Sequence, residues 1–242
     1  MKFLNSALRS AAIAAIVSAT FAAASAGTPN PDSVRPLAEL SERFGMPNLA
    51  KKLDGGKNVK IAYLGGSITE QNGWRVHSRK YLERKYPKAR VGEINAAIGG
   101  TGSDLGCLRV GADVIAKNPD AVFVEFAVND AWRNPREIFR DMEGIVRQIW
   151  AKSRETDICF VYTVTERDAA ALENGEMSRA ASAMEELADY YGIPSIHFGK
   201  EIAENLASGN LVMKTGADVK YADGEALDEN AAIGRTPDGK IP

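Results

Sequence analysis

Residues 59–69 read VKIAYLGGSIT, an apolar run followed by two glycines, a serine, an isoleucine and a threonine. A short apolar run closed by glycine is typical of a strand buried in a parallel sheet. Gly65 and Gly66 let the backbone turn after the strand and let another molecule approach it closely. We therefore expect Ser67 to stand between a strand and a helix, with its hydroxyl at the edge of the sheet.

The centre of the chain repeats this alternation of strand and helix. Four further apolar runs predict strands at 91–98, 120–127, 157–164 and 194–198. Helical periodicity and capping signals predict helices at 74–86, 103–117, 134–152, 176–191 and 199–207. The alternation predicts an α/β fold: a flavodoxin-like, three-layer sandwich with a parallel five-stranded sheet covered on both faces.

The N-terminal segment 1–26 reads as a secretory signal peptide. It combines Lys2 and Arg9 with a small, apolar run that ends in Ala24-Ser25-Ala26. We expect cleavage after Ala26, a secreted or periplasmic protein, and no membrane anchor after cleavage. An uncleaved amphipathic helix is the alternative.

The remaining chain divides into an arm and a main domain. Residues 27–57 are expected to form an N-terminal helical arm, and 58–242 the main domain. Residues 211–242 are polar and dotted with glycine, and they read as a long loop. Such loops are uncommon inside a finished domain.

The composition is that of a soluble globular protein. The 242 residues include 30 basic and 32 acidic side chains, and the net charge is −2. No basic stripe with interleaved aromatic residues indicates a nucleic-acid partner. Cys107 and Cys159 are too few for a disulfide framework and have no neighbours at metal-ligand spacing. We expect two buried free thiols rather than a bridge, and no metal or cofactor.

Candidate catalytic residues occur in the loops after the first three predicted strands. Ser67 follows the first strand, Gly100 the second and Asn129 the third. The carboxyl ends of parallel strands meet at one edge, so these residues are expected to lie together. A serine beside amide donors suits acyl transfer, because the donors stabilise a tetrahedral oxyanion. A phosphate-binding loop is the alternative, but residues 65–69 lack its Gly-Lys-Ser ending and the dinucleotide glycine spacing.

These three segments together resemble the SGNH (GDSL-like) hydrolases. GGSIT at 65–69 is similar to the family's first block, NAAIGG at 95–100 to its second, and AVND at 127–130 to its third. The resemblance covers about residues 58–200 and implies that Ser67 is the nucleophile. It also implies that the Gly100 amide and the Asn129 side chain form the oxyanion hole. Ala127 departs from the family, which has glycine there.

The catalytic base is the part of the family pattern that this sequence does not supply. The family carries its base in an Asp-x-x-His block near the C-terminus, and this chain has two histidines. His77 is expected on the helix after Ser67, facing the surface. His197 is expected three strands away from Ser67, with Pro194 in place of the aspartate. We therefore expect the chain to be truncated, with the base beyond Pro242.

The resemblance implies a serine esterase that acts through an acyl-enzyme. We expect it to hydrolyse short acyl esters, acetyl first of all, on a small molecule or a carbohydrate. Two alternatives stay open: an O-acyltransferase with the same site, and a carbohydrate-binding protein that has lost its base.

Three charged residues near the predicted site have structural interpretations. Glu125 is expected to be a hydrogen-bonded structural acid, and Asp130 to brace the loop that carries Asn129. Arg75 is consistent with binding a substrate oxygen or with a salt bridge to the loops.

Overall fold

The computed structural model describes residues 29–212, and a six-stranded sheet runs through their centre. The strand order is β1-β6-β5-β4-β2-β3. Strands β2 to β6 run parallel to one another, and β1 pairs antiparallel with β6 at the edge. The strands are β1 (Leu40–Ser41), β2 (Val59–Gly65), β3 (Val91–Asn95), β4 (Ala121–Glu125), β5 (Asp157–Tyr162) and β6 (Ser195–His197).

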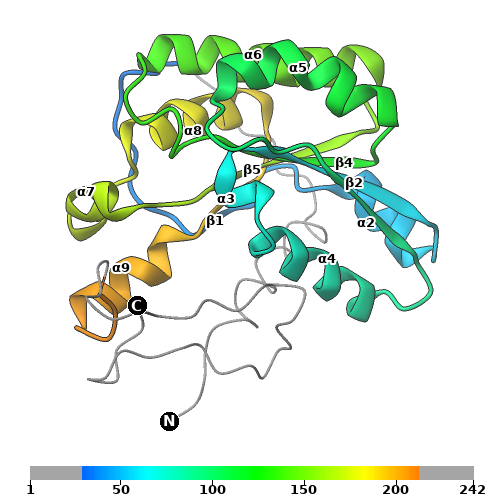
Figure 1. Ribbon diagram of the computed structural model, residues 1–242, viewed down its shortest axis with the longest axis horizontal. Helices are drawn as coiled ribbons and strands as arrows, with labels where there is room; N and C mark the ends of the chain where they lie inside the picture. The colour runs from blue at the N-terminus through cyan, green and yellow to red at the C-terminus, as the bar shows by residue number, and fades with distance from the viewer. Residues whose placement is uncertain (1–28, 213–242) are drawn as a thin grey trace.

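Helices cover both faces of the sheet, so the fold is the predicted three-layer sandwich (Figure 1). One face carries α5 (Ser103–Asp113), α6 (Pro135–Lys152) and α8 (Arg179–Tyr191), and the other carries α2 (Pro47–Asp54) and α4 (Trp74–Lys85). Shorter elements are α3 (Ser67–Glu70), α7 (Ala169–Glu173), α9 (Gly199–Ala207) and the 3₁₀ turns η1 (Ile115–Lys117) and η2 (Glu166–Asp168).

The central strands are buried along their whole length. Every residue of β4 and β5 is buried, as expected for strands with helices on both sides. Successive side chains of β4 enter opposite layers: Val122 and Val124 pack with α5, α6 and α8, and Ala121 and Phe123 with α2 and α4.

Helix α6 forms where its sequence signals place it. The Asn134 side chain accepts a hydrogen bond from the Arg136 N–H at 2.9 Å, and Pro135 occupies the first turn. Its buried residues are Pro135, Ile138, Met142, Ile145, Val146 and Ile149, which form one apolar face.

The prediction of five strands is corrected to six. Leu40 pairs with Ile196 and Ser41 with Ser195, which adds a two-residue antiparallel strand beside β6. Two residues are too short to show the alternation by which strands are predicted. The parallel part of the sheet has the five strands that were expected.

The helical arm is also corrected. Within its described part, from residue 29 to 57, only Pro47–Asp54 is α-helical. Leu49 and Leu53 are the buried residues of this helix. Most of the residues before it run in irregular or extended conformation over the edge of the sheet. The predicted signal peptide, and all but two residues of the predicted loop 211–242, lie outside the described residues.

The two cysteines are free thiols on opposite faces of the sheet. Cys159 is buried among the residues that pack with α2 and α4. Cys107 is half-buried against the layer of α5, α6 and α8. The sheet separates them, which explains why no bridge forms. Between residues 29 and 212, no helix combines the length and the apolar character needed to cross a bilayer.

Candidate active site

Ser67 is the first residue of α3, immediately after the turn that ends β2. Gly65 is required in this turn because an added Cβ would lie 2.7 Å from the Glu125 carbonyl oxygen and 2.6 Å from the Thr69 hydroxyl. The sequence thus predicted the strand-to-helix junction correctly. It did not predict that the helix is only one turn long and separate from α4.

The segment after β3 brings its glycines beside Ser67. A Cβ added to Gly99 would lie 3.6 Å from the Ser67 Cβ, and the Gly99 N–H donates to the Glu70 carboxylate at 2.9 Å. Gly100 follows in the left-handed region with φ of 77°, where an added Cβ would meet open space. The backbone of this turn is therefore held against α3 while Gly100 stays accessible.

Asn129 reaches the same point from the loop after β4. Its side-chain oxygen would lie 2.3 Å, and its side-chain nitrogen 3.0 Å, from a Cβ added to Gly66. Only glycine at 66 leaves room for this contact. Ala127, where the SGNH hydrolases have glycine, is buried in the apolar layer, so its methyl group is accommodated.

The three predicted site residues therefore lie at the carboxyl edge of the sheet: Asn129 contacts Gly66, which precedes Ser67, and Gly100 follows Gly99, which faces Ser67. Among residues 29–212, the Ser67 hydroxyl, the Gly100 N–H and the Asn129 carboxamide make no hydrogen bond with the protein. A hydroxyl and amide donors that are brought together and left without partners are available to a bound molecule.

Glu125 fixes the loops around this point. Its buried carboxylate accepts hydrogen bonds from the Thr69 and Thr163 hydroxyls, both at 2.8 Å, and from the Gly66 backbone. Burial raises the pKa of Glu125, and these hydrogen bonds oppose that shift. The carboxylate joins the ends of β2, β4 and β5, so the prediction of a structural acid is confirmed.

Asp130 and Arg75 also brace the site. The buried Asp130 carboxylate accepts the Ser103 N–H at 3.1 and 3.2 Å, at the start of α5. Burial raises the pKa of Asp130, against the opposing effect of its hydrogen bonds with Ser103. Arg75 is buried, forms an ion pair with Glu93 and donates to the Thr69 carbonyl at 3.0 Å. Arg75 thus forms a salt bridge as one interpretation expected, but its partner Glu93 lies on β3 rather than in a loop.

Two further arginines support the site without having been predicted. Arg133 donates to the Ser103 hydroxyl at 3.0 Å and to Asp141 at 2.6 Å. Arg109 donates to the Gly65 carbonyl at 3.3 Å and to the Ala96 carbonyl. The only sequence signal was the spacing of Arg133 from Asp130, three residues apart in a turn.

Neither histidine lies in hydrogen-bond contact with Ser67. His197 is buried at the end of β6, with β5 and β4 between it and β2. Its Nδ1 accepts the Gly199 N–H at 3.0 Å, and burial lowers its pKa to about 4. The predicted distance of three strands is confirmed. His77 lies on α4 and is half-buried rather than on the open surface.

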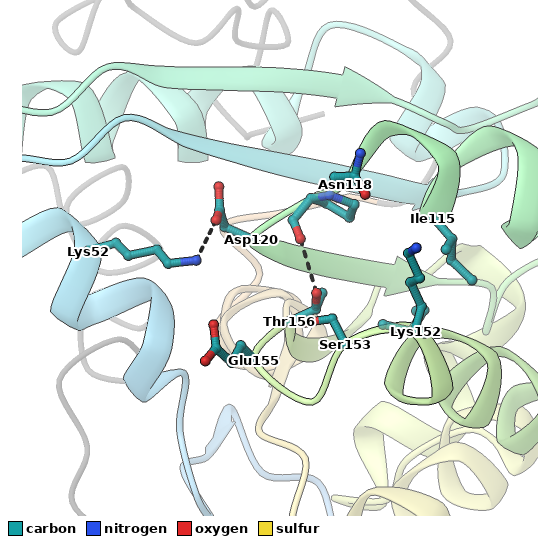
Figure 2. A pocket seen from close by; sticks show the side chains of 10 residues that line it. Lys52, Ile115, Asn118, Asp120, Lys152, Ser153, Glu155 and Thr156 are labelled. Carbon is teal, nitrogen blue, oxygen red and sulfur yellow. Dashed lines mark hydrogen bonds and ion pairs between the residues drawn. The ribbon is translucent and has the colours of Figure 1, made fainter.

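A hollow of about 200 Å³ lies at the opposite edge of the sheet, by the amino ends of β4 and β5 (Figure 2). Polar groups there are paired with each other: Lys52 with Asp120 at 2.7 Å, a pair drawn in Figure 2, and the Thr156 hydroxyl with the Pro119 carbonyl at 3.1 Å. Ligand sites of α/β folds lie at the carboxyl edge, so we place the candidate site at Ser67. Across residues 29–212, no three or more His, Cys, Asp and Glu side chains gather to hold a metal ion.

Solved structures of a two-domain esterase active on acetylated mannans are similar to this chain. One, co-crystallised with mannopentaose, is 25% identical over 74% of this chain, with a TM-score of 0.57. The other is 27% identical over 68%, with a TM-score of 0.58. The match covers 47% and 44% of those chains, so this chain spans about half their length.

Family-level similarity covers the same part of the molecule as the candidate site. A search of the curated proteins found no match. The model of the GDSL-like lipase/acylhydrolase family matches residues 63–219, which include all three candidate site residues. By this match, the chain belongs to the GDSL-like lipase/acylhydrolase family.

Proposed function

We propose that this protein is a serine esterase that removes short acyl groups, acetyl first of all, from carbohydrates. The observation that carries the proposal is that the loops of Ser67, Gly100 and Asn129 contact one another through Gly66 and Gly99, while the Ser67 hydroxyl, the Gly100 N–H and the Asn129 carboxamide are unpaired among the described residues. Membership of the GDSL-like family supports ester hydrolysis. The similarity to an esterase active on acetylated mannans supports a carbohydrate substrate.

In the proposed reaction the Ser67 oxygen attacks the ester carbonyl and its proton passes to a general base. The Gly100 N–H, the Asn129 side chain and the Ser67 N–H donate to the negative oxygen of the tetrahedral intermediate. One such donor contributes about 3 kcal/mol of transition-state stabilisation. The sugar hydroxyl leaves, and water then releases acetate from the acyl-enzyme through a second tetrahedral intermediate.

The proposal requires a general base, and neither histidine of residues 29–212 is placed beside Ser67. Serine is a weak nucleophile without an adjacent base. His197 is held three strands away and His77 makes no hydrogen bond with Ser67. Neither described histidine therefore serves as the base in this proposal. Without a base, this site would bind a carbohydrate ester and not turn it over.

The test measures acetate release by the purified natural protein from p-nitrophenyl acetate and from acetylated manno-oligosaccharides. We expect Ser67→Ala to lower kcat/KM by at least a thousandfold on both substrates. Ser153→Ala is the matched control, because Ser153 lines the hollow at the opposite edge, and it should retain activity.

Each result decides between the candidate functions. Wild-type turnover by the Ser67→Ala variant would overturn the proposal. Binding of the oligosaccharide without acetate release, in wild type and variant alike, would favour the binding protein. Acetyl groups recovered on an added sugar acceptor rather than as acetate would identify the transferase.

A further inference from the structure

Trp132 stands on the surface close to the candidate site. It lies three residues after Asn129, in the turn between β4 and α6, and 81% of its surface is exposed. An exposed tryptophan leaves a large apolar area in water, and tryptophan is enriched at binding interfaces. The position calls for a partner that covers the ring.

The turn that carries Trp132 is held on both sides. The Asp130 N–H donates to the Phe126 carbonyl and the Arg133 N–H to the Asp130 carbonyl, both at 2.9 Å. The Arg133 guanidinium is fixed in turn by Ser103 and Asp141. The ring therefore projects from a braced backbone, and a ligand that stacks on it orders little further chain.

Arg167 approaches the ring from a different loop. Its guanidinium carbon lies 5.7 Å from the centroid of the Trp132 ring, a cation–π distance. Arg167 belongs to η2, the turn that follows β5, and the capping box of Thr165 and Asp168 fixes that turn. Two loops at the carboxyl edge thus bring a flat apolar ring and a hydrogen-bond donor to one place.

We propose that Trp132 and Arg167 form a subsite for a sugar ring of the acylated carbohydrate. The inference rests on the proposed function and specifies its substrate: an ester on a pyranose chain, rather than a simple alkyl ester. A pyranose presents an apolar face of C–H groups, which stacks on indole, and a rim of hydroxyls, which accept from guanidinium. Because Trp132 lies in the turn that also carries Asn129, a sugar ring bound there is on the same edge of the sheet as the proposed reacting ester.

A protein partner is the competing occupant of this surface. The observation that favours a protein partner is the exposure of two leucines on α5: Leu105 is 48% exposed and Leu108 is 82% exposed, and a protein interface would use such side chains. A single sugar ring needs only the aromatic platform and a polar donor. The combination of Trp132 with Arg167, from two loops of the catalytic edge, favours the sugar.

The first experiment compares specificity in the natural protein with Trp132→Ala, Trp132→Phe and the control Leu108→Ala. The measured quantity is kcat/KM for an acetylated manno-oligosaccharide divided by kcat/KM for p-nitrophenyl acetate. We expect Trp132→Ala to lower this ratio about tenfold, mostly through KM, and Trp132→Phe to recover most of it. Leu108→Ala should leave the ratio unchanged. An equal loss on both substrates would overturn the subsite, because Trp132 would then act only on the loop of Asn129.

A second experiment separates this inference from the proposed function. Mannopentaose is titrated into the protein while tryptophan fluorescence is recorded. We expect a saturable change in wild type that is absent in Trp132→Phe. That result with no esterase activity would retain the subsite and reject the esterase. Esterase activity with no fluorescence change and an unaltered specificity ratio would reject the subsite and retain the esterase.

Discussion

Glu125 shows how one buried side chain sets the geometry of the candidate site. Its carboxylate takes hydrogen bonds from Thr69, Thr163 and the Gly66 backbone, which lie at the ends of three strands or their loops. Glu125→Ala leaves those donors buried without an acceptor, and we expect a loss of about 3 kcal/mol in the free energy of unfolding. Glu125→Gln keeps an acceptor and should cost about 1 kcal/mol. Urea unfolding measures both values, and equal losses would contradict this role.

His197 gives the molecule a testable pH dependence. Burial lowers its pKa from 6.5 to about 4, so below pH 6.5 the unfolded chain takes up a proton that the folded chain refuses. The stability present above pH 6.5 is therefore lost as pH falls toward 4. The loss amounts to about 3 kcal/mol for a shift of this size.

The His197→Asn variant isolates this effect. An asparagine oxygen can still accept the Gly199 N–H but does not titrate. Denaturant unfolding at pH 7 and pH 4.5 should show a smaller decrease for the variant than for wild type. The raised pKa values of Glu125 and Asp130 act in both proteins and cancel in this comparison. Identical decreases would show that His197 is protonated in the folded state.

At the residue scale the sequence predicted what local motifs encode. Ser67, Gly100 and Asn129 were predicted because each lies in a short block after an apolar run, and the structure brings them together. The hydrogen bonds from Thr163 to Glu125 and from Arg133 to Ser103 join residues 38 and 30 positions apart. Such pairs depend on which strands become neighbours, and no local pattern shows this.

At the scale of elements, the start of α5 depends on a neighbouring loop. Gly102 precedes the helix and has no capping side chain, and the Asp130 carboxylate accepts the Ser103 N–H instead. A carboxylate also interacts favourably with the positive end of the helix dipole. We expect Asp130→Ala to destabilise the protein by about 2 kcal/mol, through the lost cap and the lost ion pair between Asp130 and Arg133, whose N···O distance is 3.5 Å. It should also lower kcat on p-nitrophenyl acetate, since the same loop carries Asn129.

The comparison variant for this prediction is Asn134→Ala, which removes the exposed cap of α6. It should cost about 1 kcal/mol without changing kcat, because its hydrogen bond to Arg136 lies at the far end of the loop. Thermal unfolding and steady-state kinetics test both variants. If Asp130→Ala lost stability but kept full kcat, the loop would not depend on this cap.

Elements with a sequence pattern of their own were predicted, including the short β6 and α9, whereas β1 and α7 were not. The parallel strands β2, β4 and β5 and the helix α6 lie within their predicted ranges to within a few residues. β1 has two residues, and its existence follows from pairing with β6 rather than from its own sequence. The predicted arm reduces to α2 because the chain before it is held by side chains of α8, a contact over more than 140 positions.

At the scale of the whole molecule, ion pairs with α8 hold the segment before α2 against the edge of the sheet formed by β1 and β6. Arg35 pairs with Glu186 and Asp189 of α8, and Arg43 with Glu185 and Asp189. Glu185 also accepts from the Tyr162 hydroxyl at 2.8 Å, so it links α8 to β5. These contacts hold β1 against β6 and cover an edge that would otherwise be open to pairing with another chain.

Arg43 is the most buried arginine among these ion pairs. Its side chain is 9% exposed and that of Glu185 is 3%, and the Arg43 backbone has φ of 42°, a conformation that side-chain contacts must maintain. Arg43→Met leaves the Glu185 charge buried without its ion-pair partner. We expect a loss of about 3–5 kcal/mol in the free energy of unfolding.

Two comparisons make this last prediction specific. Arg140→Met removes an arginine that is 70% exposed and paired with Asp141, and it should change stability by less than about 1 kcal/mol. The double variant Arg43→Met with Glu185→Gln should recover part of the loss, because no charge then stays buried without a partner. Urea unfolding at pH 7 measures all four proteins. If Arg43→Met cost no more than Arg140→Met, the segment before α2 would rest on the sheet through its apolar contacts alone, and its ion pairs would not hold the edge strand in place.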